Sequence, residues 1–385
     1  MLIRVPSEAT IASCESALRK IEDRASGAHQ ILLPTHFKRM EMGAEIAWVQ
    51  MLLTWAQGEP SGALQTFADS PDDQQVDRLT DRMIGTVASL CAGRVVSKSS
   101  GKDLTDAYRA KALDRLNALQ DRRPNQATKG PSIEVITGDD YGRDKPASFY
   151  PRTRDGSRLL GSRDYFMRAA PRMLGAISRQ VSWLEQDELS QRTFGTLLYE
   201  AFRNTEDHAR RDLDGNIVNH SYRLVQASFA GQLPEALDRA TAGYAPLRKY
   251  IRRFSPKAGH KQLSFVTLSI LDSGPGFAQT WTQKPLQQLS DEEEYAATLD
   301  CFTAGTRKAH DVYGRGLVLV REFLRKSNGF LRLRTGRMSL FYDAHADVSP
   351  DGPIPVERWR PESGTQLAPV SGALLTMMFP VRGTH

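Results

Sequence analysis

The sequence predicts a mixed α/β protein, with a two-layer α/β sandwich in the C-terminal half and a mainly helical region before it. Two patterns carry this prediction. Apolar residues recur at three- and four-residue spacing before residue 125, and helical and strand-like segments alternate after residue 185. The chain has 385 residues, 40% hydrophobic and 25% charged, as is typical of globular proteins. We expect three units, 1–125, 126–184 and 185–385.

Several functional classes have little support in the sequence. The longest apolar runs, such as Phe265–Leu271 and Leu374–Phe379, have the length of strands, so no membrane span or membrane partner is expected. Arg4 and Glu8 interrupt the N-terminus where a signal peptide would be apolar, which predicts a cytoplasmic location. The three cysteines are far apart and odd in number, which argues against a disulfide framework.

The region 1–125 carries three helical patterns. They cover Phe37–Ala56, the apolar repeat from Val76 to Leu90, and Asp103–Arg122. Residues 126–184 are rich in Gly, Pro, Ser and Arg, apart from one strand-like segment at Ile133–Thr137. We therefore expect a connector with a small β element and a helix that follows it.

The last 200 residues alternate between the two periodicities, which predicts one α/β unit. The expected elements are a helix at Glu188–Ala209, a strand at Tyr222–Phe229, a helix at Ala245–Arg253, a strand at Leu263–Leu271, a helix at Leu317–Lys326, a hairpin at Gly329–Tyr342 and a strand at Leu374–Phe379.

Three motifs in this unit concentrate polar residues. In the helical segment EAFRNTEDHA, Glu200, Asn204 and Asp207 fall within about 60° of one another. Taken alone, this strip is also what an ordinary amphipathic helix shows. In ILDSGPGF, a strand delivers Asp272 to a turn built on Gly274 and Gly276, which is a plain turn or a ligand-binding loop.

The third motif is YGRGLVL, in which Gly314 and Gly316 stand directly before an apolar helix. Free N–H groups at a helix start attract anions, so a phosphate would fit there. A long polar loop of about 37 residues separates this motif from the Asp272 turn. By itself, Gly-x-Gly before a helix is more often a cap than a phosphate cradle.

In this order, the motifs resemble those of the GHKL superfamily, which contains gyrase B subunits, heat-shock chaperones of the ninety-kilodalton class, sensor histidine kinases and MutL. The resemblance covers roughly Glu188 to Pro380 and implies a Bergerat-type ATP-binding fold. It implies that Asn204 binds Mg²⁺, that Glu200 acts as the general base toward water, and that Asp272 accepts a hydrogen bond from adenine. Gly274 and Gly276 would shape the adenine pocket.

The resemblance also implies a lid that closes over the phosphates. Gly314, Arg315 and Gly316 match the second glycine motif, and Leu317 follows it; Thr306 and Lys308 are the candidate γ-phosphate donors of the lid. Asp207 lies on the same polar strip of the helix as Asn204, and we count it among the residues expected to bind the nucleotide. Gly364-Thr365 matches the pair whose hydroxyl supports the adenine-binding Asp, although Gly372-Ala373 has the better spacing to Pro380; we favour Thr365.

The resemblance implies an Mg²⁺-dependent ATPase that acts as a nucleotide-controlled switch. Two alternatives stay open: a phosphotransferase like the histidine or serine protein kinases, and a nucleotide-holding scaffold that binds a protein or nucleic-acid partner through the N-terminal half. Many members dimerise when nucleotide binds, so a homodimer is open as well. Nucleic acid is a less favoured partner, suggested only by basic runs at 248–257 and 321–334.

Overall fold

The computed structural model describes the chain except for residues 24–28, 121–127, 130–131, 140–144, 178–187, 256–261, 304–315, 348–354, 362–363 and 382–385. The structure confirms the mixed α/β class and contains both parallel and antiparallel sheets. Among the described residues, no helix combines the length and the apolar character that a membrane span needs.

The N-terminal region is built on a parallel sheet with the strand order β1-β3-β5-β6. Helices follow the strands and connect them, as parallel pairing requires. The strands are β1 (Leu2–Arg4), β3 (Gln30–Leu32), β5 (Ala63–Thr66) and β6 (Arg94–Ser97), and the helices are α1 (Ile11–Glu22), α2 (Ala44–Gly58), α3 (Gln74–Thr80), α4 (Met83–Cys91) and α5 (Thr105–Gln120). A separate short pair joins β2 (Glu8–Ala9) to β4 (Arg39–Met40).

The expectation of a mainly helical region was therefore incomplete, because residues 1–125 form an α/β layer. Its four parallel strands are only three or four residues long, too short to show a period-two pattern. The apolar repeat from Val76 to Leu90 is two helices, since the chain breaks at Asp81 and Arg82. The other two helical patterns correspond to α2 and α5.

The C-terminal region is built on an eight-stranded sheet with the order β13-β12-β11-β14-β10-β9-β8-β7, in which every neighbouring pair is antiparallel. β8 comes from the predicted connector, so that segment contributes to the sheet. The strands are β7 (Thr128–Lys129), β8 (Ser132–Gly138), β9 (Tyr222–Gln232), β10 (Leu263–Asp272), β11 (Phe330–Gly336), β12 (Met338–Asp343), β13 (Glu357–Arg358) and β14 (Val370–Pro380).

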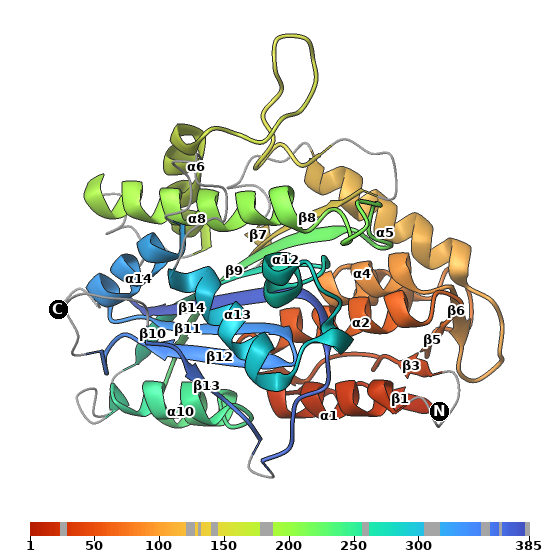
Figure 1. The fold of residues 1–385 in the computed structure, drawn as a ribbon. Coiled ribbons are helices and arrows are strands. Elements are labelled where there is room, and N and C mark those ends of the chain that lie inside the picture. The colour runs from red at the N-terminus through yellow and green to blue at the C-terminus, as the bar shows by residue number, and fades with distance from the viewer. Residues whose placement is uncertain are drawn as a thin grey trace.

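Helices cover both faces of this sheet (Figure 1). On one face, Phe379 of β14 packs against Phe194 of α8 and Phe323 of α14. On the other, Thr376 of β14 contacts Gly43 at the start of α2, and Met378 joins the cluster of α9 and α10. The helices are α6 (Arg163–Ile177), α8 (Glu188–His208), α9 (Pro234–Ala240), α10 (Ala245–Arg252), α12 (Phe277–Thr282), η4 (Leu286–Gln288), α13 (Asp291–Thr303) and α14 (Gly316–Ser327).

The expected two-layer sandwich is thus a three-layer arrangement, because α2 and α10 cover the face that two layers would leave open. All seven residues of β11 are buried, as expected for a strand covered on both sides. α2 itself is buried around most of its circumference, which fits a helix inside a core rather than on a surface. One apolar cluster accordingly runs through both regions.

Buried ion pairs also join the two regions. Glu15 of α1 receives two hydrogen bonds from Arg334 of β11, at 2.9 and 3.0 Å, and lies 3.3 Å from Arg332. All three side chains are at least 95% buried. Gln50 of α2 donates to the carbonyls of Arg334 and Ser371. The N-terminal region is therefore fixed directly to the central strands β11 and β14.

Candidate functional site

Asp272 lies at the C-terminal tip of β10, on the sheet face that packs against α8. Strand alternation places its side chain on the same face as Ile270 and Leu268, which pair with β14 residues in register with Phe379. The carboxylate accepts hydrogen bonds from the backbone N–H groups of Gly274 (3.0 Å) and Ala373 (3.3 Å). Burial raises the pKa of Asp272 to about 6, although these two N–H groups oppose the rise.

The turn after Asp272 is held by close backbone contacts. Gly276 has a φ of +88°, a conformation that glycine adopts readily and other residues rarely adopt. The backbone N–H of the next residue, Phe277, donates a hydrogen bond to Thr335 Oγ1 at 3.1 Å. Thr335 in turn donates to the carbonyl of Gly372. A Cβ on Gly372, whose φ is +67°, would lie 1.8 Å from the Asp272 carbonyl oxygen. The glycines therefore let β14 and the turn approach Asp272 closely.

The polar strip of α8 is only partly exposed. Glu200 is buried, with 3% of its surface exposed, and its carboxylate pairs with the guanidinium of Arg163 at the start of α6. Asn204 is half-buried, and Asp207 is exposed and pairs with Arg203 at 3.1 Å. Of the three predicted side chains, Asn204 is thus the amide that borders solvent, whereas Glu200 is already engaged.

The C-terminal end of α8 reaches the Asp272 turn. A Cβ on Gly274 would lie 2.5 Å from the Cα of Ala209, so only a glycine allows this approach. Ser273 accepts a hydrogen bond from the Tyr222 N–H and donates to the His220 carbonyl. The structure therefore brings the C-terminal end of the helix of Asn204 close to the tip of the interior strand β10.

A buried charge cluster next to Asp272 was not predicted. Arg223 of β9 is opposite Asp272 in the sheet register and fully buried. Its guanidinium contacts Asp139 at 2.6 and 3.0 Å and Glu206 of α8 at 2.5 Å, and Tyr150 donates to Glu206. Burial alone would raise the pKa of Asp139, but the Arg223 guanidinium holds this pKa well below its usual range.

The cluster had one signal in the sequence, which is an arginine inside the apolar strand YRLV at 222–225. A buried arginine requires a carboxylate partner. Its partners are Asp139, directly after β8, and Glu206 in α8. Both are distant from Arg223 in the chain, and only the fold identifies them. Arg223 also favours the ionised form of Asp272, so the cluster tunes the candidate site.

The two candidate Gly-containing pairs, Gly364-Thr365 and Gly372-Ala373, differ in their contacts with Asp272. Thr365 is exposed, whereas Asp272 is buried. Gly372 and Ala373 directly border Asp272: the Gly372 N–H donates to the Gly274 carbonyl at 2.7 Å, and the Ala373 N–H donates to the carboxylate. Among the described residues, the hydroxyl that bonds to this turn is that of Thr335 in β11, which accepts from the Phe277 N–H and donates to the Gly372 carbonyl.

The predicted lid candidates Thr306, Lys308, Gly314 and Arg315 lie outside the described residues. Gly316 and Leu317 begin α14, as the glycine motif predicts for a helix start. Within the described part of the chain, no group of three or more His, Cys, Asp or Glu side chains is arranged to hold a metal ion.

The basic runs are largely neutralised by carboxylates. Arg248 and Arg252 both pair with Asp238, and Arg253 pairs with Asp343. Arg321 and Arg325 lie near Asp347, while Arg332 and Arg334 are buried against Glu15. Paired arginines are poorly placed to neutralise phosphates in a row, which weakens the nucleic-acid alternative.

Comparisons with known proteins give no independent assignment. No protein-family model matches the chain, no curated protein matches it, and no solved structure matches it.

Proposed function

We propose that the C-terminal region binds ATP together with Mg²⁺, with the adenine at the tip of β10 and the phosphates toward α8. The observation that carries this proposal is the environment of Asp272. It is a buried carboxylate beside a glycine turn, and no arginine or lysine of the described residues forms an ion pair with it. Such a group is suited to accept a hydrogen bond from an exocyclic amino group.

The order of elements supports the same proposal. The helix with Asn204 precedes the antiparallel pair β9–β10, and α14 precedes the hairpin β11–β12, with β14 lying between the two pairs. Asp272 and the helices α8, which carries Asn204, and α14 lie on the same face of the sheet. ATP would then lie with its base against Asp272 and its phosphates near Asn204 and the helix start.

Titration calorimetry with ATP and GTP, with and without Mg²⁺, tests the proposal. ATP is expected to bind more tightly than GTP, because the guanine O6 is an acceptor and would face the Asp272 carboxylate. Asn204→Ala is expected to remove the Mg²⁺ dependence of ATP binding. Asn117→Ala in α5 is the matched control and should leave it unchanged. Equal binding of ATP and GTP, or none, would contradict the proposal.

The pairing of Glu200 with Arg163 favours a second candidate, a nucleotide-holding scaffold without appreciable turnover. A general base must reach water with a free lone pair, and here the carboxylate is buried and bonded to a guanidinium. In an ATPase, Arg163 would have to move away from Glu200 before hydrolysis.

Phosphate release separates the two candidates. If the protein is an ATPase, Glu200→Gln abolishes release while ATP stays bound, and Arg163→Met accelerates release by freeing the carboxylate. If it is a scaffold, the wild type and both variants bind ATP and none releases phosphate.

A further inference from the structure

We infer that a cavity between the N-terminal region and the α12–α13 segment is a binding site for a small organic monocation. The cavity has a volume of about 370 Å³, which is within the range of small-molecule sites. Its walls come from α1, α2, η4, the turn after β11, and Pro369 before β14. This site is separate from the proposed ATP site.

The lining defines the class of ligand. Leu18, Ile21, Leu286 and Pro369 supply apolar walls, and Trp55 lies among them. Two carboxylates, Glu22 and Glu59, stand at the α1 and α2 sides. An apolar body with a single amine or guanidine group therefore matches the cavity, with the charge directed at the Glu22 carboxylate and the body against the apolar walls.

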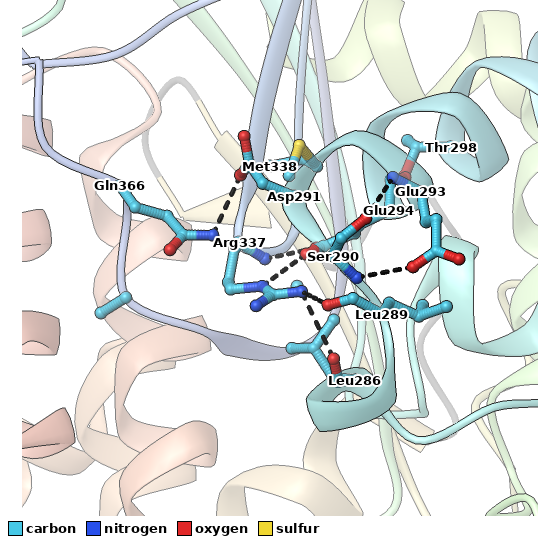
Figure 2. Close-up of polar contacts among 12 residues, drawn as sticks. Leu286, Leu289, Ser290, Asp291, Glu293, Glu294, Thr298, Arg337, Met338 and Gln366 are labelled. Carbon is cyan, nitrogen blue, oxygen red and sulfur yellow. Dashed lines mark hydrogen bonds and ion pairs between the residues drawn. The ribbon is translucent and has the colours of Figure 1, made fainter.

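The charges around the cavity are unbalanced. Its one lining arginine, Arg337, pairs at 2.6 Å with Glu294, which is 1% exposed. Arg337 also donates to the carbonyls of Leu286 and Leu289 (Figure 2). Glu59 is bonded to the backbone N–H and the ring of His29 at 2.6 and 2.7 Å. Glu22 is exposed and forms no ion pair with any described residue, so the lining carries an uncompensated negative charge.

The cavity walls also touch elements that hold the candidate ATP site. Thr54 accepts a hydrogen bond from the Ser371 N–H at 3.0 Å, and the next residue, Gly372, bonds to the Asp272 turn. Arg337 fixes α13, which leads toward the predicted lid. On the basis of the proposed function, a ligand in the cavity is expected to change the affinity for ATP, since the hydrogen bond from Ser371 to Thr54 connects the cavity wall to the residue that precedes Gly372.

Gly58 offers a clean way to close the cavity. It lines the cavity at the end of α2, and a Cβ built on it meets no atom within 4 Å. Because Gly58 is exposed, Gly58→Leu is expected to obstruct the cavity at its rim without a clash, and Gly58→Ala is the matched control that leaves the rim open. Both replace a glycine in a helix, a change that favours the helix.

Saturation-transfer NMR with benzylamine tests the site, with benzyl alcohol as the uncharged probe of similar shape. Benzylamine is expected to bind the wild type and Gly58→Ala, to lose its signal with Gly58→Leu, and to bind Glu22→Gln about threefold more weakly. Benzyl alcohol should bind more weakly than benzylamine to the wild type. An unchanged benzylamine signal with Gly58→Leu, or no signal with the wild type, would overturn the inference.

A titration of ATP with and without benzylamine tests the coupling. A shift in ATP affinity that disappears in Gly58→Leu supports it, and an unchanged affinity contradicts it. If ATP does not bind at all, the proposed function fails while the benzylamine result still decides the cavity site.

Discussion

The middle of α8 and the tip of β10 each present a buried carboxylate to the candidate site, but in opposite electrostatic settings. Glu200 is 3% exposed and Asp272 is 7% exposed. Glu200 is paired with Arg163, whereas Asp272 is held by two backbone N–H groups, and burial raises its pKa to about 6. Similar burial therefore accompanies an ion pair at Glu200 and two backbone hydrogen bonds at Asp272.

The largest effect should come from removing the Asp272 carboxylate. Asp272→Asn is expected to weaken ATP binding about 100-fold, because a hydrogen bond to a charged acceptor contributes about 1.5–3 kcal/mol. Calorimetry measures the change, with Asp238→Asn in α9 as a control that should bind ATP normally. Wild-type affinity in Asp272→Asn would show that the two carboxylates do not differ in the way we infer.

The same substitution should stabilise the folded protein at neutral pH. The folded pKa of Asp272 lies above the ordinary value of 3.8. Protonation of Asp272 therefore stabilises the folded protein fully below about pH 4, and this stabilisation is lost as the pH rises through 6. Asp272→Asn is expected to gain about 2 kcal/mol at pH 7, because it removes the cost of ionising a carboxyl whose pKa is about 6 rather than 3.8. Urea unfolding at pH 4 and pH 7 should show this gain only at pH 7.

Nucleotide affinity should follow the ionisation of Asp272. With a pKa of about 6, the ionised fraction falls about tenfold between pH 7 and pH 5, and ATP binding should weaken by a similar factor beyond any change in the phosphates. Tripolyphosphate, which lacks adenine, reports the phosphate contribution alone. Parallel pH profiles for ATP and tripolyphosphate would rule out a role for Asp272 in holding the base.

The smallest effect is expected at the Glu200 carboxylate. Arg163 is 44% exposed at its side chain, so solvent screening limits the ion pair to about 1 kcal/mol. Arg163→Met should destabilise the protein by about this amount, and Glu200→Gln should remove most of that penalty in the double variant. Urea unfolding of the four proteins gives the coupling energy. A coupling energy near zero would mean that the pair does not hold Glu200 in the folded protein.

The long, strongly patterned elements were predictable. The helix with Glu200 and Asn204 and the strand that ends at Asp272 occur as predicted, within a few residues. The missed segments are of two kinds. The helices α1 and α13, with 12 and 13 residues, lie where no element and a long polar loop were expected, respectively. The strands β1, β3, β5 and β6 have three or four residues each. In so short a run, neither a period of two nor a helical period can be distinguished.

The candidate site was only partly predictable for a different reason. The sequence marks Asp272 and its glycines, since a turn after a strand is a local feature. It does not show that Arg163 reaches Glu200, or that Arg223 joins Asp139 and Glu206. These pairs connect residues that are distant in the chain, and nothing local in either partner identifies the other.

By itself, the sequence determined the periodicities of the major helices and strands, and with them the polar strip on α8 and the acidic tip of β10, because these depend on neighbours along the chain. The tertiary structure alone decided that the N-terminal region covers the second face of the sheet, and that Glu200 pairs with an arginine while Asp272 accepts backbone hydrogen bonds. Burial and pairing depend on which distant side chains share a low-dielectric environment, and that is a property of packing rather than of local sequence.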